Sequence, residues 1–225
     1  MQPRHDMYRN VHKGLRRTLC ALVVDAGAAD ATPAALDEIA ARWLSISALL
    51  DAHHHHEDAH IGPHLARLAP ALRAEMEAEH QALAGVQLAL DQAARALRDD
   101  GDLGVRALAF HRSVAHFVGR YLSHMAEEEG PYLRALQAAY DDATLAGIEG
   151  ALVASIAPPV MGAFLAQMLP ALTAAERLEL LTDMREHAPP EAFAGALALA
   201  AQVLDARAHR ALSHALAAPR EVARA

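Results

Sequence analysis

Cysteine, aromatic residues and positive charge are all scarce in this sequence of 225 residues. Cys20 is the only cysteine, which excludes an intramolecular disulfide and a metal cluster held by several thiolates. Aromatic residues are 4% of a chain that is 53% hydrophobic, so Ala and Leu dominate and helix is favoured over strand. The 20 basic residues against 28 acidic ones, with a pI near 6.0, argue against nucleic-acid binding.

The sequence also offers no convincing signal or membrane-spanning segment. Residues 1–13 carry charges where a signal peptide needs an apolar run. The uncharged stretch 150–175 is long enough to raise the question of a membrane span, but Pro158, Pro159 and Pro170 interrupt it. We therefore expect buried helical pieces here, and a soluble cytoplasmic protein that does not associate with a membrane.

Turn-forming residues divide the first part of the chain into helical segments. We expect four helices over about residues 4–26, 32–61, 71–98 and 103–129. Thr32-Pro33 provides an N-cap followed by Pro at the first helical position. Gly62-Pro63 and Pro70 mark a bend and a turn, Asp99-Asp100-Gly101 ends the third helix, and Gly130-Pro131 ends the fourth. Short loops between long helices predict an all-α, up-down-up-down four-helix bundle.

The second part of the chain is also predicted to be helical. Pro158-Pro159 and Pro189-Pro190 each begin a helical segment, and Thr173 with Glu176 forms a predicted capping box. We expect one domain over residues 1–140 and a helical C-terminal extension over 141–225. This extension would pack on the bundle or mediate homo-oligomer formation.

Histidine is unusually abundant, and 12 of the 15 histidines lie within the first 124 residues. Helical periodicity predicts one buried stripe on each helix of the bundle, and every stripe contains a histidine where an apolar residue is expected. Two stripes add a glutamate one turn after the histidine. The residues at these positions are His12 in the first helix, His53 and Glu57 in the second, His80 in the third, and His124 and Glu128 in the fourth.

Six ionisable side chains in one core would be costly unless they were paired or bound a cation. A single histidine on an apolar face is usually an ordinary core residue, but four such faces in one bundle point to a metal. The helical rise places His80 at the level of both His124 and Glu57, whereas His12 and His53 match less closely. Imidazole and carboxylate without thiolate suit iron or manganese, and zinc less well. Carboxylates from two helices could bridge two metal ions.

Several segments resemble the hemerythrin-like, or HHE cation-binding, domain family. They are MYRNVHKGLRR (7–17), HHHHEDAHIGPHL (53–65), EMEAEHQAL (75–83) and YLSHMAEEEGPYL (121–133). The resemblance covers about residues 5–140 and implies that the metal ligands are His12, His53, Glu57, His80, His124 and Glu128. It also implies two iron ions bridged by Glu57 and Glu128. The segment 155–181 resembles an extension found in some bacterial members.

The sequence departs from the oxygen-carrying hemerythrins, which have a second histidine one turn from the first on the third helix and an aspartate on the fourth. Met76 and Ala84 flank His80 here. The resemblance therefore implies one missing imidazole and an open or water-filled position. His60 is a possible extra ligand. We expect His54 and His56 on other faces of the helix, and the neighbours of Glu128 to be solvated.

Three functions are compatible with the sequence. The first is a non-haem di-iron protein that binds O2, NO or iron for sensing, storage or stress response. The second is a di-iron oxidoreductase. It could be an oxygenase, an oxidase or an enzyme that uses a reductant to remove peroxide or NO. The third is a metal-free helical interaction protein, in which the histidines are incidental.

Overall fold

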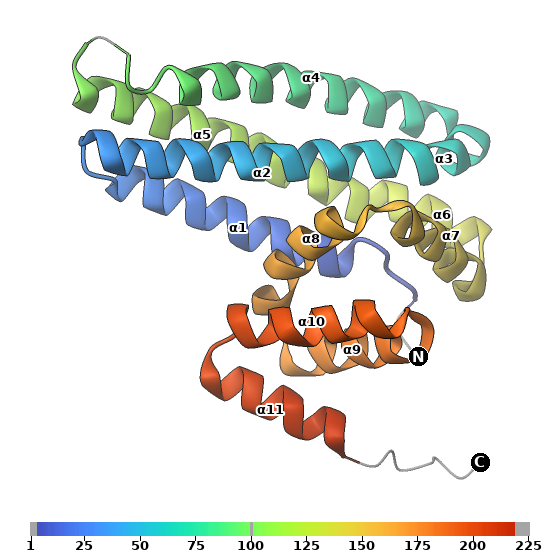
Figure 1. Ribbon diagram of the computed structural model, residues 1–225. Helices are drawn as coiled ribbons and strands as arrows, with labels where there is room; N and C mark the ends of the chain where they lie inside the picture. The colour runs from blue at the N-terminus through green and yellow to red at the C-terminus, as the bar shows by residue number, and fades with distance from the viewer. Residues whose placement is uncertain (1–3, 100, 219–225) are drawn as a thin grey trace, which may run out of the picture. The chain divides into compact units, whose positions relative to one another are not determined.

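Four long helices run side by side in the first part of the chain (Figure 1). In this computed structural model, which describes residues 4–99 and 101–218, they are α1 (Arg9–Ala28), α2 (Pro33–His60), α4 (Pro70–Arg95) and α5 (Leu103–Glu127). Helix α1 contacts α2 and α5, and α4 contacts the same two helices, so the four enclose one core. The described residues contain no strand, which confirms the predicted all-α bundle.

The predicted stripes form the core of this bundle. Trp43 and Phe117 are fully buried at its centre, with ring centroids 5.2 Å apart in an edge-to-face arrangement. The indole N–H of Trp43 donates to the Asp91 carboxylate at 2.8 Å, so the ring is buried without an unsatisfied donor. Each residue of the predicted metal set is also buried, whereas His60 is only partly buried.

Local capping explains where the first two helices begin. As predicted, the Thr32 side chain accepts a hydrogen bond from the backbone of Ala35 at the start of α2. Helix α1 begins later than expected, because the Asp6 carboxylate accepts hydrogen bonds from the backbone N–H groups of Tyr8 and Arg9. Arg4 and His5, the described residues before Asp6, are therefore not helical.

One Pro-containing segment ends a helix as predicted and the other does not. Helix α2 ends at His60, and the chain enters a short helix, α3 (Gly62–Leu68), because Pro tolerates the first helical turn; the predicted turn before Pro70 comes at Ala69. At Gly130-Pro131 the chain forms a π-helical turn, η1 (Glu128–Tyr132), and continues as α6 (Leu133–Ala139). Pro131 has no N–H to donate, and the N–H of Leu133 bonds to the Glu128 carbonyl five residues back.

Helix α7 (Asp142–Ser155) packs against this end of the bundle. Its buried Leu145 and Ile148 join Tyr8, Met76 and Leu136 in a second cluster of apolar residues. The described residues divide into two compact units between Ala157 and Pro158. The division thus lies one helix later than the expected boundary at residue 140, because α7 buries its apolar residues in the first unit.

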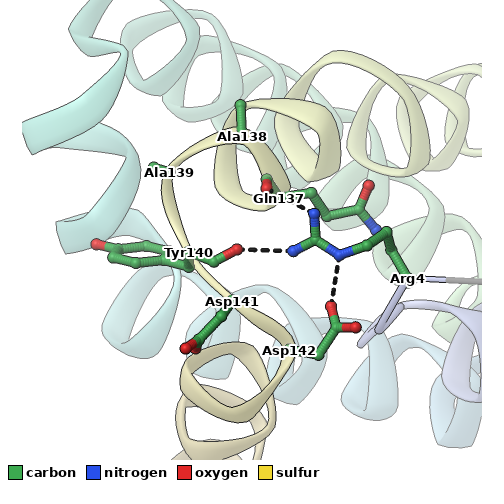
Figure 2. A pocket seen from close by; sticks show the side chains of 7 residues that line it. All are labelled: Arg4, Gln137, Ala138, Ala139, Tyr140, Asp141 and Asp142. Carbon is green, nitrogen blue, oxygen red and sulfur yellow. Dashed lines mark hydrogen bonds and ion pairs between the residues drawn. The ribbon is translucent and has the colours of Figure 1, made fainter.

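Arg4 is one of the residues that line an open pocket at this end of the first unit (Figure 2). Its guanidinium group donates hydrogen bonds to the backbone carbonyls of Gln137 and Tyr140, at 3.0 and 2.7 Å, where α6 ends. It also donates to the Asp142 carboxylate at 2.6 Å (Figure 2). Arg4 thereby fixes the start of the described chain to the junction of α6 and α7, and it satisfies carbonyls left unpaired by the end of α6.

Over its described residues, the second unit consists of four shorter helices: α8 (Pro158–Ala171), α9 (Ala174–His187), α10 (Pro190–Val203) and α11 (Ala206–Ala217). The predicted capping box is present, since Thr173 and Glu176 exchange side-chain-to-backbone hydrogen bonds at the start of α9. The unit has its own apolar core, in which Leu165, Leu181 and Leu212 come from three different helices. Asp100, residues 1–3 and the end of the expected extension, 219–225, lie outside the described residues.

Taken singly, none of the described helices combines the length and the apolar composition that a membrane span requires. Helices α7 and α8 meet this criterion only as a pair joined through a sharp break.

Candidate metal centre

The bundle core brings together seven side chains that can bind a metal, in two adjoining groups. One group consists of His12, His53, Glu57 and Glu128, and the other of His54, His80 and His124. Within each group the potential ligand atoms lie within 4.8 Å of one another, and every residue is buried. The six residues identified in the sequence therefore all lie here, together with His54, which was expected elsewhere.

The two glutamates lie between the groups and direct one oxygen to each. Glu128 Oε2 lies 3.3 Å from His12 Nε2, and its Oε1 lies 3.1 Å from His124 Nε2. Glu57 Oε1 lies 3.2 Å from His53 Nε2, and its Oε2 lies 3.9 Å from His80 Nε2. Each carboxylate can therefore offer an oxygen atom to both groups, which is the arrangement that a pair of bridged metal ions requires.

Carboxylates on the outer side of the bundle orient three of the imidazoles. Nδ1 of His12 lies 2.9 Å from Glu129, which also accepts hydrogen bonds from Arg16. Nδ1 of His124 lies 2.9 Å from Glu79. Because an ionised carboxylate only accepts hydrogen bonds, each of these Nδ1 atoms carries a proton, which leaves Nε2 as the ring nitrogen that can bind a metal in the centre.

His80 follows the same pattern. Its Nδ1 lies 3.3 Å from the Asp58 carboxylate, which is also bonded to Arg73 at 2.9 Å. The Nε2 atoms of His80 and His124 then face each other at 3.1 Å. With only the Nδ1 atoms protonated, the two Nε2 lone pairs would repel each other at this distance. The arrangement is favourable when a proton is shared between the two Nε2 atoms or when both atoms bind a metal cation.

Many of the remaining polar atoms in the centre lack a hydrogen-bond partner among the described residues. These atoms are Nε2 of His12, His53 and His54 and both carboxylate oxygens of Glu57 and Glu128. Buried polar atoms are nearly always hydrogen-bonded, and an unsatisfied one costs about 1–3 kcal/mol. These nitrogen and oxygen atoms converge on one place and lack partners, which fits a bound metal, because coordination to the metal would satisfy all of them together.

The pKa values of the buried groups reflect their burial and the charges of their neighbours. Burial, and then the neighbouring Glu128 carboxylate, raise the pKa of Glu57 well above its usual value. Burial also opposes ionisation of Glu128, but contacts with His12, His124 and His80 hold its pKa well below the usual value. Burial and the adjacent imidazoles of His80 and His124 lower the pKa of His54 to about 3, so His54 is a neutral imidazole.

His54 is the residue that the sequence interpretation missed. It was placed on another face of α2, and the chain was expected to lack one imidazole. In the structure its ring stacks on His80, with centroids 4.3 Å apart, and on Tyr121 at 5.3 Å. The signal available in the sequence was the paired His53-His54, since consecutive helical residues point about 100° apart and can face two neighbouring helices.

The other histidines and the neighbours of Glu128 lie outside the two groups. His60 is partly buried and belongs to neither group, and His116 is exposed. Glu127 is exposed, as expected for a solvated residue. Glu129 was also expected to be solvated, but it contacts His12 and Arg16.

Two buried tyrosines lie beside the centre. The ring of Tyr8 lies 5.1 Å from that of His12, and the ring of Tyr121 lies 5.9 Å from that of His124. Neither hydroxyl group has a hydrogen-bond partner among the described residues. Burial, followed by the charges of Glu57 and Glu128, raises the pKa of both phenols, so each keeps a proton that it could donate to a bound ligand.

Comparison with known proteins agrees with this geometry. The sequence model of the hemerythrin HHE cation binding domain matches residues 5–136, which contain both donor groups. Comparisons with curated proteins and with solved structures give no match. The buried His and Glu groups and the family match together identify a metal-binding protein. The chain belongs to the hemerythrin HHE cation-binding domain family.

Proposed function

We propose that the bundle holds two iron ions and binds a small diatomic ligand, O2 or NO, or stores iron itself, in sensing or stress response. The supporting observation is the arrangement of Glu57 and Glu128, each of which directs one oxygen to each donor group. Five imidazoles and two carboxylates, without thiolate, suit iron better than zinc, because seven donors exceed one tetrahedral site.

The two donor groups are unequal, and this favours a ligand-binding role. Three imidazoles belong to one group, whereas the other has only two, from His12 and His53. With the shared carboxylates, the group of His12 and His53 offers four protein donors, fewer than an octahedral cation accepts. A small exogenous ligand would therefore bind on the side of His12 and His53. Bound iron would supply redox chemistry and affinity for such a ligand.

An oxidoreductase is the second candidate, and the two buried phenols favour it. Tyr8 and Tyr121 keep their protons and have no partner among the described residues, so each could donate a hydrogen bond or a proton during a reaction. Sustained consumption of O2, NO or peroxide with an added reductant would distinguish this function from simple binding. Tyr8→Phe or Tyr121→Phe should then slow turnover without removing iron.

The test is elemental analysis of protein purified without a metal-affinity resin, combined with an optical spectrum before reduction, after reduction and after return to air. We expect about two iron ions per chain and near-ultraviolet charge-transfer absorption that bleaches on reduction and returns. Glu128→Ala should lose metal, whereas its exposed neighbour Glu127→Ala should keep it. Stably bound zinc, or no metal, would overturn the proposal.

A further inference from the structure

Two histidines at the end of α2 lie outside the metal centre and next to each other. His56 and His60 are four residues apart, so they lie one above the other on the same helical face. Their ring centroids are 6.4 Å apart and the rings are inclined by only 29°. Both side chains are partly exposed, and His60 lines a groove between the end of α2 and α7.

The hydrogen bonds of Ser155 favour one tautomer of His56. The Ser155 hydroxyl donates its single proton to the carbonyl of Leu152 at 2.7 Å. With that proton engaged, the Ser155 oxygen accepts from the N–H of His56 Nδ1, which lies 3.0 Å away. The proton of His56 is thus on Nδ1, and Nε2 keeps a lone pair. A hydrogen bond of this kind also orients an imidazole that binds a metal through its other nitrogen.

His60 can supply the second lone pair. Neither of its ring nitrogens has a hydrogen-bond partner among the described residues, so the imidazole is free to present either one. His64, four residues further on, differs from it in two respects. It follows the helix break at Ile61, and its Nδ1 is bonded to the Tyr140 hydroxyl at 2.8 Å.

We propose that His56 and His60 form a second, solvent-facing site for one divalent transition-metal cation such as Zn²⁺ or Cu²⁺. Two imidazoles one helical turn apart chelate one cation, imidazole nitrogen is a preferred donor for both metals, and water completes the coordination. The site uses none of the seven residues of the centre. It therefore does not depend on the centre holding iron.

Equilibrium dialysis of untagged full-length protein, with its core metal in place, against Zn²⁺ tests the proposal. We expect one zinc per chain in addition to the core metal. His56→Ala and His60→Ala should each weaken this binding by roughly 10²-fold, because loss of one imidazole removes the chelate effect. Ser155→Ala should weaken it by about tenfold, because His56 loses the partner that orients it.

His55→Ala is the matched control, since His55 is an exposed histidine beside His56 on the same helix. It should bind zinc like the wild type. With Cu²⁺ in place of Zn²⁺, electron paramagnetic resonance should show two nitrogen ligands in the wild type and one in His60→Ala. Equal zinc binding by the His55 and His60 variants would overturn the proposal, as would loss of core metal in His60→Ala. Core metal content, measured in the same samples, tests the di-iron proposal separately.

Discussion

At the scale of the residue, the metal centre depends on groups that do not themselves face it. His12, His80 and His124 each point Nε2 inward because a carboxylate holds Nδ1 from outside. Two of these carboxylates in turn accept hydrogen bonds from arginines, Arg16 and Arg73. Such chains fix the imidazole orientation before a metal binds, which lowers the cost of assembling the site.

Substitution of Glu129 tests this outer layer. Glu129→Gln keeps the size of the side chain but removes the charge that binds both His12 and Arg16. We expect metal affinity to fall by about tenfold or more, as measured by competition with a chelator of known affinity. Glu127→Gln is the control, because Glu127 is exposed. Equal affinities in the two variants would show that Glu129 does not orient His12.

The contribution of His54 can be tested in the same way. His54→Ala removes one of the three imidazoles of the second donor group. We expect metal content to fall from about two ions per chain towards one, with a lower midpoint of thermal unfolding, because metal binding adds to folding stability. The exposed His55→Ala serves as control. If His54→Ala kept full metal content after exposure to a chelator, His54 would not be a ligand.

At the scale of the element, the π turn places two consecutive glutamates in different roles. Glu128 begins η1 and is fully buried in the centre, whereas Glu129 reaches the outer side of His12. The turn also carries the helix past Pro131 into α6, whose end is fixed by Arg4. A π turn at this position agrees with the frequent occurrence of such turns at functional sites.

The contact of Arg4 with Asp142 predicts a pH dependence. The hydrogen bond from Arg4, followed by that from the backbone of His5, lowers the pKa of Asp142. A carboxyl group with a lowered pKa stabilises the folded state above its unfolded pKa of about 3.9, and this contribution is lost as pH falls through the folded-state value. Acidification should therefore release the segment before α1 from the junction of α6 and α7.

Hydrogen exchange of the first α1 residues and the segment before them measures this release. We expect protection in the wild type to decrease, relative to Asp142→Asn, as pH falls below about 4. The Asn variant should show low protection throughout, because it lacks the charge that binds Arg4. Parallel behaviour of the two proteins across this pH range would contradict the prediction.

At the scale of the whole molecule, the metal centre lies within one of two units. All seven candidate ligands, and the carboxylates that orient them, precede the division between Ala157 and Pro158. The second unit has an apolar core of its own. A role of its helices in homo-oligomer formation, expected from the sequence, remains a prediction that sedimentation of the full chain would test.

A chain that ends at Ala157 should therefore fold and retain its metal. We expect its metal content per chain to equal that of the full-length protein, and its far-ultraviolet circular dichroism to remain strongly helical. A shorter chain, ending at Tyr140, should be less stable, because it loses the buried Leu145 and Ile148 of α7. A folded chain ending at Ala157 that bound no metal would show that the second unit is needed for the centre.

Much of the fold could be predicted from the sequence because its signals are local. The buried faces of the four long helices follow from apolar residues recurring at helical spacing, and the caps at Thr32 and Thr173 from side chains that pair with backbone N–H groups nearby. The composition of the centre was also accessible. Histidine and glutamate at buried helical positions are costly without a cation, wherever the helices lie.

What the sequence by itself determined was thus the helical class, the buried face of each helix and the chemical type of the candidate metal ligands. Only the tertiary structure decided that His54 joins the centre, that Glu129 holds His12, and that the chain continues as a helix through Pro131. The physical reason is the same in each case. These outcomes depend on which neighbouring side chain or backbone group lies opposite a residue, and helical periodicity alone does not specify that partner.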